Sequence, residues 1–392
     1  MQPLPIPFPL LTNSPQTKPL QPFFMNTLTL SRKFQSMNKL LLALMVALCL
    51  FGIYAIYSAT WMRDVPFFTS QIRWLFICLP IYFVVAFNDY RWVRYGAIPI
   101  YLISVILLIL VFFIGVKVFG ARSWLNLGFG NFQPSQMAIF GGVLLFALFL
   151  SESSGMHSAL RILICLGFLA VPCVLILIQP YLGGTLVWLP VLFAMLYVGG
   201  VQVRYLATLL LLGIALIPVV VNFGLKPYQK DRILIFLDPS LDPKGAGWTI
   251  NQSLNAIGSA GFWGKGFKAH NTLNELGYLP STIVHTDFIY SVFGEQHGFL
   301  GALLLIPTFA ILLLLGLYIA SKARDQLGRL LAVGIVMLLF THVFMNIGMT
   351  VAVTPITGLP LPMVSYGGSF LLITISCLGL LQSVWIHRKA IS

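Results

Sequence analysis

Asp287 is the acidic residue best placed to do chemistry, because it lies in the polar run His285 to Phe288 directly before a long apolar stretch. A carboxylate at the start of such a stretch can exchange a proton with a bound molecule. It can equally cap the helix that follows and interact with the helix dipole. Position alone favours the cap, and the residues leave both interpretations open.

Charged residues gather around Asp287 in one segment, from about Phe223 to His297. Lys265 and Lys268 lie there among exposed amides and are candidates to hold a phosphate. The alternative is a solvated loop with ordinary surface charges. Close backbone approach is nevertheless predicted by four glycines, Gly258, Gly261, Gly264 and Gly266. The segment contains six of the ten acidic residues, Asp231, Asp238, Asp242, Glu275, Asp287 and Glu295, and the basic residues Lys226, Lys230, Arg232, Lys244, Lys265 and Lys268.

Two further polar segments have compositions suited to a binding site. One runs from Gly120 through Arg122 and Trp124 to Gln133 and Ser135, and the other, residues 355–369, contains Ser365 and Tyr366. Proline, glycine and aromatic residues here also fit turns and an interfacial aromatic belt. Arg122 beside Trp124 is less easily explained as a turn.

Composition defines what must position these residues. The 392-residue chain is 58% hydrophobic and only 8% charged, and its mean hydropathy is +0.93. These values exclude a water-soluble fold. The net charge of +13 is spread too thinly for a nucleic-acid surface. All five cysteines fall in apolar runs without metal-ligand spacing, so we expect them to be packing residues and expect no metal site.

Ten apolar runs are long enough to cross a bilayer, which takes about 20 residues. Since backbone polar groups must be paired inside lipid, all ten are predicted to be helices. The sequence therefore predicts an all-α polytopic membrane protein. The runs begin near Leu40, Trp74, Tyr95, Gln136, Ala159, Gly183, Tyr205, Gly298, Leu330 and Ser369.

The distribution of basic residues predicts the orientation. If the spans alternate, most basic residues of the short connections fall on one side, which the positive-inside rule makes cytoplasmic, while Arg63, Arg73, Lys117 and Arg122 fall on the other. Both termini are then cytoplasmic, and the segment 223–297 is an extracytoplasmic loop between helices seven and eight. Residues 1–36, rich in Pro, Ser, Thr and Gln, are expected to form a disordered cytoplasmic tail. The basic residues on the predicted cytoplasmic side are Arg32, Lys33, Lys39, Arg91, Arg94, Arg161, Arg204, Lys322, Arg324, Arg329, Arg388 and Lys389.

In the polar segments around Trp124, Asp287 and Ser365, and in the further stretches given below, the chain resembles the SEDS family (shape, elongation, division and sporulation) over residues 37–390. The run from Pro355 to Pro362, followed by Ser365 to Gly368, is more similar to the RodA branch than to the FtsW branch. The resemblance rests on Gly120 to Trp124, Phe132 to Ser135, Tyr228 and Gln229, Arg232 and Ile233, Phe236 to Pro239, Asp242 and Pro243, Gln252 and Ser253, Ala256 to Ser259, Gly264 to Gly266, His285 to Phe288, and Asn346 to Gly348.

The resemblance implies a ten-helix peptidoglycan glycosyltransferase of the bacterial cytoplasmic (inner) membrane. Such an enzyme polymerises lipid II during cell elongation, with a class B penicillin-binding protein and the cell-elongation machinery as partners and no nucleic acid. By residue match, Asp287 is the catalytic residue and Trp124 lines the site. The expected substrate-binding set is Trp124, Arg122, Gln133, Ser135, Arg232, Lys265, Lys268, His285, Ser365 and Tyr366.

Three positions depart from the family pattern. Gln136 stands where the pattern has Glu, Ile139 where it has Lys, and Tyr181 where it has Asp. A Glu and a Lys three residues apart share a helix face and can pair. Losing one member of a buried pair costs about 3 to 5 kcal/mol, whereas losing both is often nearly neutral. The joint absence therefore indicates a coordinated replacement.

The implied reaction needs one base and one group that stabilises the departing pyrophosphate. Asp287 fits the base, since a late proton transfer asks only for modest basicity. A single displacement inverts the anomeric centre. Charge on the pyrophosphate can be compensated by Lys265, Lys268, Arg232 or Arg122, or by a divalent cation, Mg²⁺ or Mn²⁺.

Two other functions compete with polymerisation. A lipid II flippase or transporter would use broken helices and charges at mid-membrane depth, and this chain has few such charges. A catalytically silent scaffold for a penicillin-binding protein is favoured only by the three departures. An intact motif around Asp287 argues against the scaffold.

Overall fold

The computed structural model describes residues 29–62, 65, 67–118, 121–126, 128, 130–179, 181–224 and 227–388. Residues 1–28 of the expected tail lie outside this part of the chain, as do Gly120, Lys226 and Lys389. The end of the expected tail is helical instead of disordered, because Leu30–Ser36 form α1. Phe34 of α1 packs against Phe87 with ring centroids 4.7 Å apart. The fold therefore begins before residue 37.

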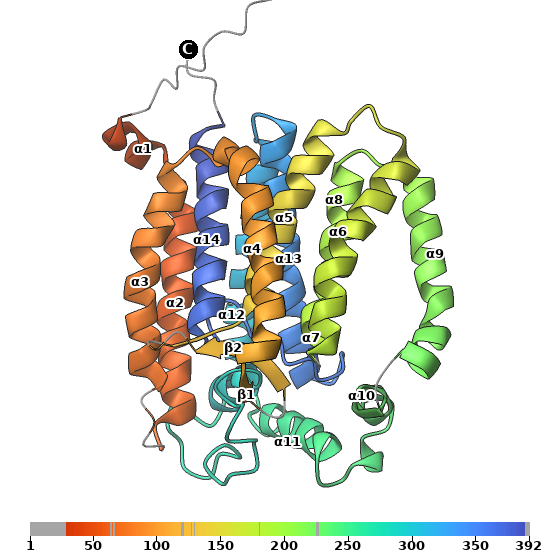
Figure 1. Ribbon diagram of the computed structural model, residues 1–392. Coiled ribbons are helices and arrows are strands. Elements are labelled where there is room, and N and C mark those ends of the chain that lie inside the picture. The colour runs from red at the N-terminus through yellow and green to blue at the C-terminus, as the bar shows by residue number, and fades with distance from the viewer. Residues whose placement is uncertain are drawn as a thin grey trace, which may run out of the picture.

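Nine helices of the described chain are long and apolar enough to span a membrane. Figure 1 shows them as a bundle of roughly parallel and antiparallel helices. The prediction of a polytopic helical membrane protein is confirmed. The helices are α2 (Lys39–Thr60), α3 (Phe67–Phe87), α4 (Val93–Ile114), α5 (Pro134–Glu152), α6 (Ser158–Ile178), α9 (Val203–Val219), α12 (Ile289–Ser321), α13 (Gln326–Thr350) and α14 (Gly368–Ile386).

The remaining predicted span is broken and shorter. It consists of α7 (Leu182–Leu186) and α8 (Trp188–Val198). Gly183 and Gly184 leave α7 with low helix propensity, and both permit contacts that a side chain would block. A Cβ at Gly183 would overlap the carbonyl of Thr357, and one at Gly184 would overlap the ring of Tyr181. The break therefore brings α7 against the segment that precedes α14.

The helices differ greatly in burial. In the most apolar 18-residue stretch of α14, 89% is buried inside the protein, whereas in α9 the share is 6%. Figure 1 shows α9 at one edge of the bundle, away from the central α5, α13 and α14. The central helices carry the polar residues that must be shielded from lipid. Helix α9 is apolar, so it needs no such shielding.

A small sheet that the sequence did not predict accompanies the helices of the described chain. A three-stranded antiparallel sheet joins α4 to α5, with β1 (Val116–Val118), β2 (Ala121–Asn126) and β3 (Asn131–Phe132). Lys117 lies opposite Arg122, and Leu125 opposite Phe132. Strands β1 and β3 are too short to show an alternating pattern in the sequence, and in β2 the polar and apolar residues do not alternate regularly.

The segment predicted as a long loop, 223–297, is largely built of helices. Its start continues α9 as a π-helical turn (Val220–Gly224), and its end, from Ile289, already belongs to α12. Between them lie α10 (Pro227–Leu237), a 3₁₀ turn (Pro239–Leu241) and α11 (Ala246–Gly258). Figure 1 shows α10 and α11 beneath one end of the bundle, at the end away from α1.

A kink in α12 is bonded to this segment through the backbone. Gly298 has φ 60° and ψ −153°, which interrupts the helix. The amides of Lys265 and Gly266 donate to the carbonyls of Glu295 and Gln296 (3.0 and 2.9 Å). In return, the amides of Phe299 and Leu300 donate to Gly261 and Phe262 (3.0 and 3.1 Å). A Cβ at Gly264 would overlap the carbonyl of Gln296, so the close approach predicted from the glycines is present there.

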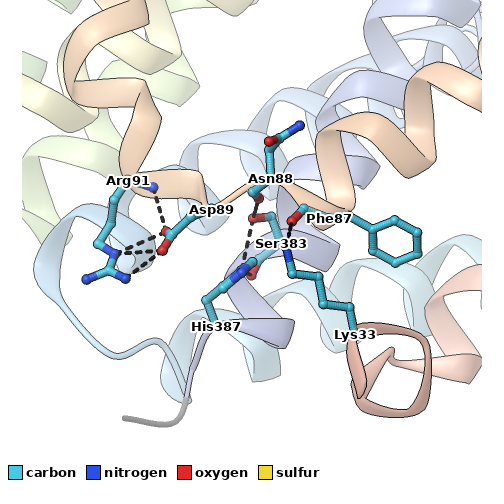
Figure 2. A network of polar contacts seen from close by, with 7 residues as sticks. All are labelled: Lys33, Phe87, Asn88, Asp89, Arg91, Ser383 and His387. Atoms are coloured by element: carbon cyan, nitrogen blue, oxygen red, sulfur yellow. Dashed lines mark hydrogen bonds and ion pairs between the residues drawn. The ribbon is translucent and has the colours of Figure 1, made fainter. Parts of the chain in front are cut away.

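At the opposite end of the bundle, a polar network ties α1, the α3–α4 turn and the end of α14 together (Figure 2). Lys33 Nζ donates to the carbonyl of Phe87 (2.6 Å), and Ser383 Oγ donates to the carbonyl of Asn88. Asp89 accepts from the backbone and guanidinium of Arg91. The two ends of the described chain therefore lie on the same side, as the positive-inside pattern predicts.

Candidate active site

Asp287 lies in a tight turn just before α12. Its backbone amide donates to the carbonyl of Ile283 (2.9 Å). The N-cap residue of α12 is Phe288, and no described side chain caps the first amides of the helix. Asp287 is thus not the helix cap that its position alone favours.

The carboxylate of Asp287 is half-buried against the backbone of a second segment. A Cβ at Gly358 would lie 3.6 Å from Asp287 Oδ2. Gly358 has φ +71°, a conformation that suits glycine and keeps this wall of the site free of a side chain. Burial raises the pKa of Asp287 to about 6, although the charge of Arg232 and a hydrogen bond from Thr286 act to lower it. The carboxylate is therefore ionised at neutral pH and is a better proton acceptor than an exposed aspartate.

The segment between α13 and α14 holds the backbone on either side of Asp287. Ser365 Oγ donates to the carbonyl of Thr286 (2.5 Å), and the amide of Tyr366 donates to the carbonyl of His285 (2.9 Å). Asn346 Nδ2 donates to the carbonyls of Asp287 (3.0 Å) and Leu359 (2.7 Å). These contacts place three predicted site residues, His285, Ser365 and Tyr366, where they position Asp287.

His285 is held by its ring as well as by its backbone. The imidazole stacks on Phe67 with centroids 3.9 Å apart, and Tyr366 lies edge-on to the same phenylalanine at 5.1 Å. Phe67 is the first residue of α3. The turn that carries Asp287 is thus fixed to α3 as well as to the segment before α14.

Arg232 is the predicted basic residue that the structure brings to Asp287. It lies on α10, and its Nη1 donates to the carbonyl of Ile356 (3.2 Å), two residues from Gly358. Its charge acts on the carboxylate from across the site. An arginine held in this way can interact with a substrate anion without neutralising the base through a direct ion pair.

Both lysines predicted to hold phosphate have partners within the protein. Lys265 Nζ lies 2.7 Å from Glu295 Oε1. Lys268 Nζ donates to the hydroxyl of Tyr57 (2.6 Å) and lies 4.4 Å from the centre of that ring. Their place among exposed amides suggested that they bind phosphate, and this role stays a prediction that the contacts within the protein do not favour.

The predicted site residues around β2 and α5 differ in their burial and in whether they contact residues near Asp287. Gln133 is buried, and its side chain hydrogen-bonds to that of Tyr181, which interacts electrostatically with Asp287. Ser135 is also buried, and its hydroxyl has no hydrogen-bond partner among the described residues. Trp124 is half-buried on β2. Arg122 is exposed and donates to the carbonyl of Phe112 (3.2 Å), at the end of α4.

The three departures from the family pattern fall at two places. Gln136 and Ile139 are both buried in α5, at 2% and 1% exposure. A lone charge at either position would lack a partner on the other, which supports their joint replacement. Tyr181 adjoins the site. Its hydroxyl donates to the carbonyl of Gly358 (3.3 Å). Tyr181, Gly358 and Asn346 are absent from the predicted site, although Tyr181 is a departure from the family pattern and the other two lie in stretches that carry the resemblance.

The described residues contain no group of three or more His, Cys, Asp and Glu side chains arranged to hold a metal ion. Asp287 has an arginine and a tyrosine as its polar neighbours, which are poor surroundings for a divalent cation. A cation that arrives with the pyrophosphate remains a prediction.

Comparison with known proteins gives consistent matches along the whole helical region. Residues 37–390 match the family model FTSW_RODA_SPOVE, described as cell cycle protein. The chain is 37% identical over 353 residues to the peptidoglycan glycosyltransferase MrdB of Escherichia coli K12, covering 90% of this chain and 94% of that one.

Two solved structures resemble the fold. The rod shape determining protein RodA of Thermus thermophilus matches with a TM-score of 0.65 and 28% identity, covering 90% of this chain and 98% of that one. A chain from a structure described as "Structural coordination of polymerization and crosslinking by a peptidoglycan synthase complex" matches with a TM-score of 0.77. It is 31% identical, with 90% of this chain and 98% of that chain covered.

Proposed function

The chain belongs to the FtsW/RodA/SpoVE family of cell cycle proteins, and we propose that it polymerises lipid II with Asp287 as the general base. It is a multi-pass protein of the bacterial inner membrane and a peptidoglycan glycosyltransferase, the activity named for its relative from Escherichia coli. The roles of individual residues, the stereochemistry and the partner are the proposed part.

The reaction joins two lipid-linked sugars. The acceptor hydroxyl oxygen forms a bond to the anomeric carbon of the donor while the bond from that carbon to the pyrophosphate oxygen breaks. The hydroxyl proton passes to the carboxylate of Asp287, and the polyprenyl pyrophosphate leaves with the bonding electrons. One displacement of this kind inverts the anomeric carbon, and a second carboxylate is not required because the leaving group is already acidic.

Arg232 is the best candidate to compensate charge on the leaving pyrophosphate. Lys265 and Lys268 are engaged elsewhere, and Arg122 points its guanidinium at the end of α4. Arg232 lies close enough to influence Asp287 and keeps donor groups beyond its one bond to Ile356. A guanidinium can bind two phosphate oxygens at once.

The environment of Asp287 carries this proposal. Among the described residues this half-buried carboxylate caps no helix and has no direct ion pair, and its pKa is raised to about 6. Groups with perturbed pKa values cluster at functional sites. Since the base must be ionised, the rate should rise with pH through about 6 and level off above it. A class B penicillin-binding protein is the proposed partner, in keeping with the synthase complex that resembles this chain.

The decisive experiment is Asp287→Asn, measured as polymerisation of purified lipid II with and without a class B partner. Asn keeps the size of the side chain but accepts no proton at neutral pH, so we expect a loss on the order of a hundredfold or more. Asp242→Asn is a matched control, because Asp242 truly caps backbone amides, those of Gly245 and Ala246 (2.9 and 2.7 Å). A folded Asp287→Asn protein with the parent rate would remove Asp287 from the mechanism and favour a flippase or a scaffold.

A further inference from the structure

Tyr181 is fixed at the junction of α6 and α7, beside the proposed base. Its amide donates to the carbonyl of Ile176 (3.3 Å), at the end of α6. Its ring lies directly over Gly184, where any Cβ would overlap it. The backbone and ring of Tyr181 are therefore both constrained, and its hydroxyl projects to one place.

That place is the wall of the Asp287 site. The Tyr181 hydroxyl donates to the carbonyl of Gly358 (3.3 Å), and Gly358 is the residue whose Cβ position lies 3.6 Å from Asp287 Oδ2. Gln133 hydrogen-bonds to the Tyr181 side chain from the start of α5. One phenol thus links α5, the α6–α7 junction and the segment before α14 at the carboxylate.

Gly358 needs such support. Its left-handed backbone favours glycine, so this residue has no side chain with which to hold its own position. Its neighbour Ile356 is held by Arg232 and its neighbour Leu359 by Asn346. The bond from Tyr181 completes this set at the residue that actually touches the base.

We propose that Tyr181 is a positioning residue for the glycosyl transfer: its hydroxyl holds Gly358 against Asp287. The inference rests on the proposed function of Asp287. A tyrosine is suited to this role because it donates a hydrogen bond while remaining neutral, so the site keeps a single negative charge. An acidic side chain in its place would compete with Asp287 for the proton.

The test is Tyr181→Phe, which keeps the ring on Gly184 and removes only the hydroxyl. The rate of lipid II polymerisation is measured from pH 5 to pH 9. Without this bond Gly358 is free to draw away and admit water to the carboxylate, so the midpoint of the acid limb should fall below the parent's by about half to one pH unit. The maximal rate should fall about tenfold, with little change in KM. Tyr181→Asp should instead raise the midpoint, because a second carboxylate disfavours ionisation of the first.

Tyr101→Phe is the matched control. Its hydroxyl also donates to a backbone carbonyl, that of Phe168 (2.7 Å), but between α4 and α6 and without contact to Asp287. Midpoints shifted in these opposite directions in the two Tyr181 variants, with the control unchanged, support the inference. An unchanged profile in Tyr181→Phe, or an equal shift in Tyr101→Phe, overturns it while leaving Asp287 as the base. Full activity in Asp287→Asn overturns the proposed function itself.

Discussion

Asp287 and Glu295 are two carboxylates close together in the chain, on either side of the start of α12, and their surroundings are opposite. Glu295 is fully buried, and its Oε1 accepts from Lys265 Nζ and from the amide of Leu273, both at 2.7 Å. Asp287 is only half-buried and has no direct cation, but lies near Arg232 and Tyr181. The charge of Glu295 is paired with Lys265 inside the protein, whereas the charge of Asp287 is left available to a bound molecule.

The difference separates a structural carboxylate from a reactive one. A buried ion pair joins elements of the fold, here the segment after α11 and the first part of α12, and breaking it leaves an uncompensated charge. A carboxylate whose pKa is raised by burial keeps its capacity to accept a proton. The sequence offered six acidic residues in this region, and only their contacts show which of these two types each represents.

The largest effect is expected from removing the cation that acts on Asp287 from a distance. In Arg232→Ala, polymerisation should fall on the order of a hundredfold, because the leaving pyrophosphate loses its charge partner. The acid limb should also shift to higher pH, since the charge of Arg232 holds the pKa of Asp287 down. Steady-state rates across pH measure both effects. Lys230, a partly exposed cation on the same helix that donates to the carbonyl of Asn222 (2.7 Å), supplies the control Lys230→Ala. Equal losses in the two variants would contradict a specific role for Arg232.

Breaking the structural carboxylate should instead cost stability. Glu295→Gln retains an acceptor for the Leu273 amide but leaves Lys265 without its ion pair. We expect a loss of about 2 kcal/mol, less than for a fully buried pair because the lysine is partly exposed. Thermal unfolding in detergent measures it, with the exposed Asp231→Asn as reference. If Glu295→Gln unfolded like the parent but lost turnover, the two carboxylates would have to exchange roles.

Replacing Asp287 by Asn should raise the stability slightly, whereas Glu295→Gln should lower it. Its folded-state pKa is raised from 3.8 to about 6, so the folded protein binds the proton more tightly than the unfolded chain. This stabilising contribution is complete below about pH 4 and is lost as the pH rises through about 6. Asn does not ionise and escapes that loss. Asp287→Asn should therefore be more stable than the parent by about 1 kcal/mol at pH 8, reduced from the full linkage value by partial exposure.

Unfolding temperatures at pH 5 and pH 8 check this prediction in a single series. The advantage of the Asn variant should be complete at pH 8 and about half as large at pH 5. An advantage that does not change with pH would show that packing, not ionisation, distinguishes the two side chains.

The smallest effect is expected at Lys268. Its ammonium group is already occupied by the hydroxyl and ring of Tyr57. Lys268→Met keeps most of the packing and should change the polymerisation rate by no more than about twofold. Kinetics with lipid II at limiting concentration measure it. A large rise in KM would restore the phosphate-binding role predicted from the sequence.

Hydropathy was enough to predict the membrane-spanning architecture, because each run of apolar residues is a local signal. The motif around Asp287 likewise identified the candidate base. The partners of Lys265 and Lys268 could not be predicted, since Glu295 and Tyr57 reach them only through the packing of α12 and α2. The same holds for Tyr181, whose hydroxyl meets Gly358 only because two glycines let α7 approach that segment.

The backbone bonds between residues 261–266 and the kink of α12 also bear on how the protein is made. A helix interrupted at Gly298 would leave amide and carbonyl groups unpaired in the bilayer, where no water can satisfy them. Here the partners come from residues 261–266, a stretch of chain that is synthesised before α12. That stretch can serve as a template on which the entering helix bends. Insertions should accordingly be tolerated after residue 266 but not between Gly261 and Gly266, where they would leave α12 without its template during biogenesis.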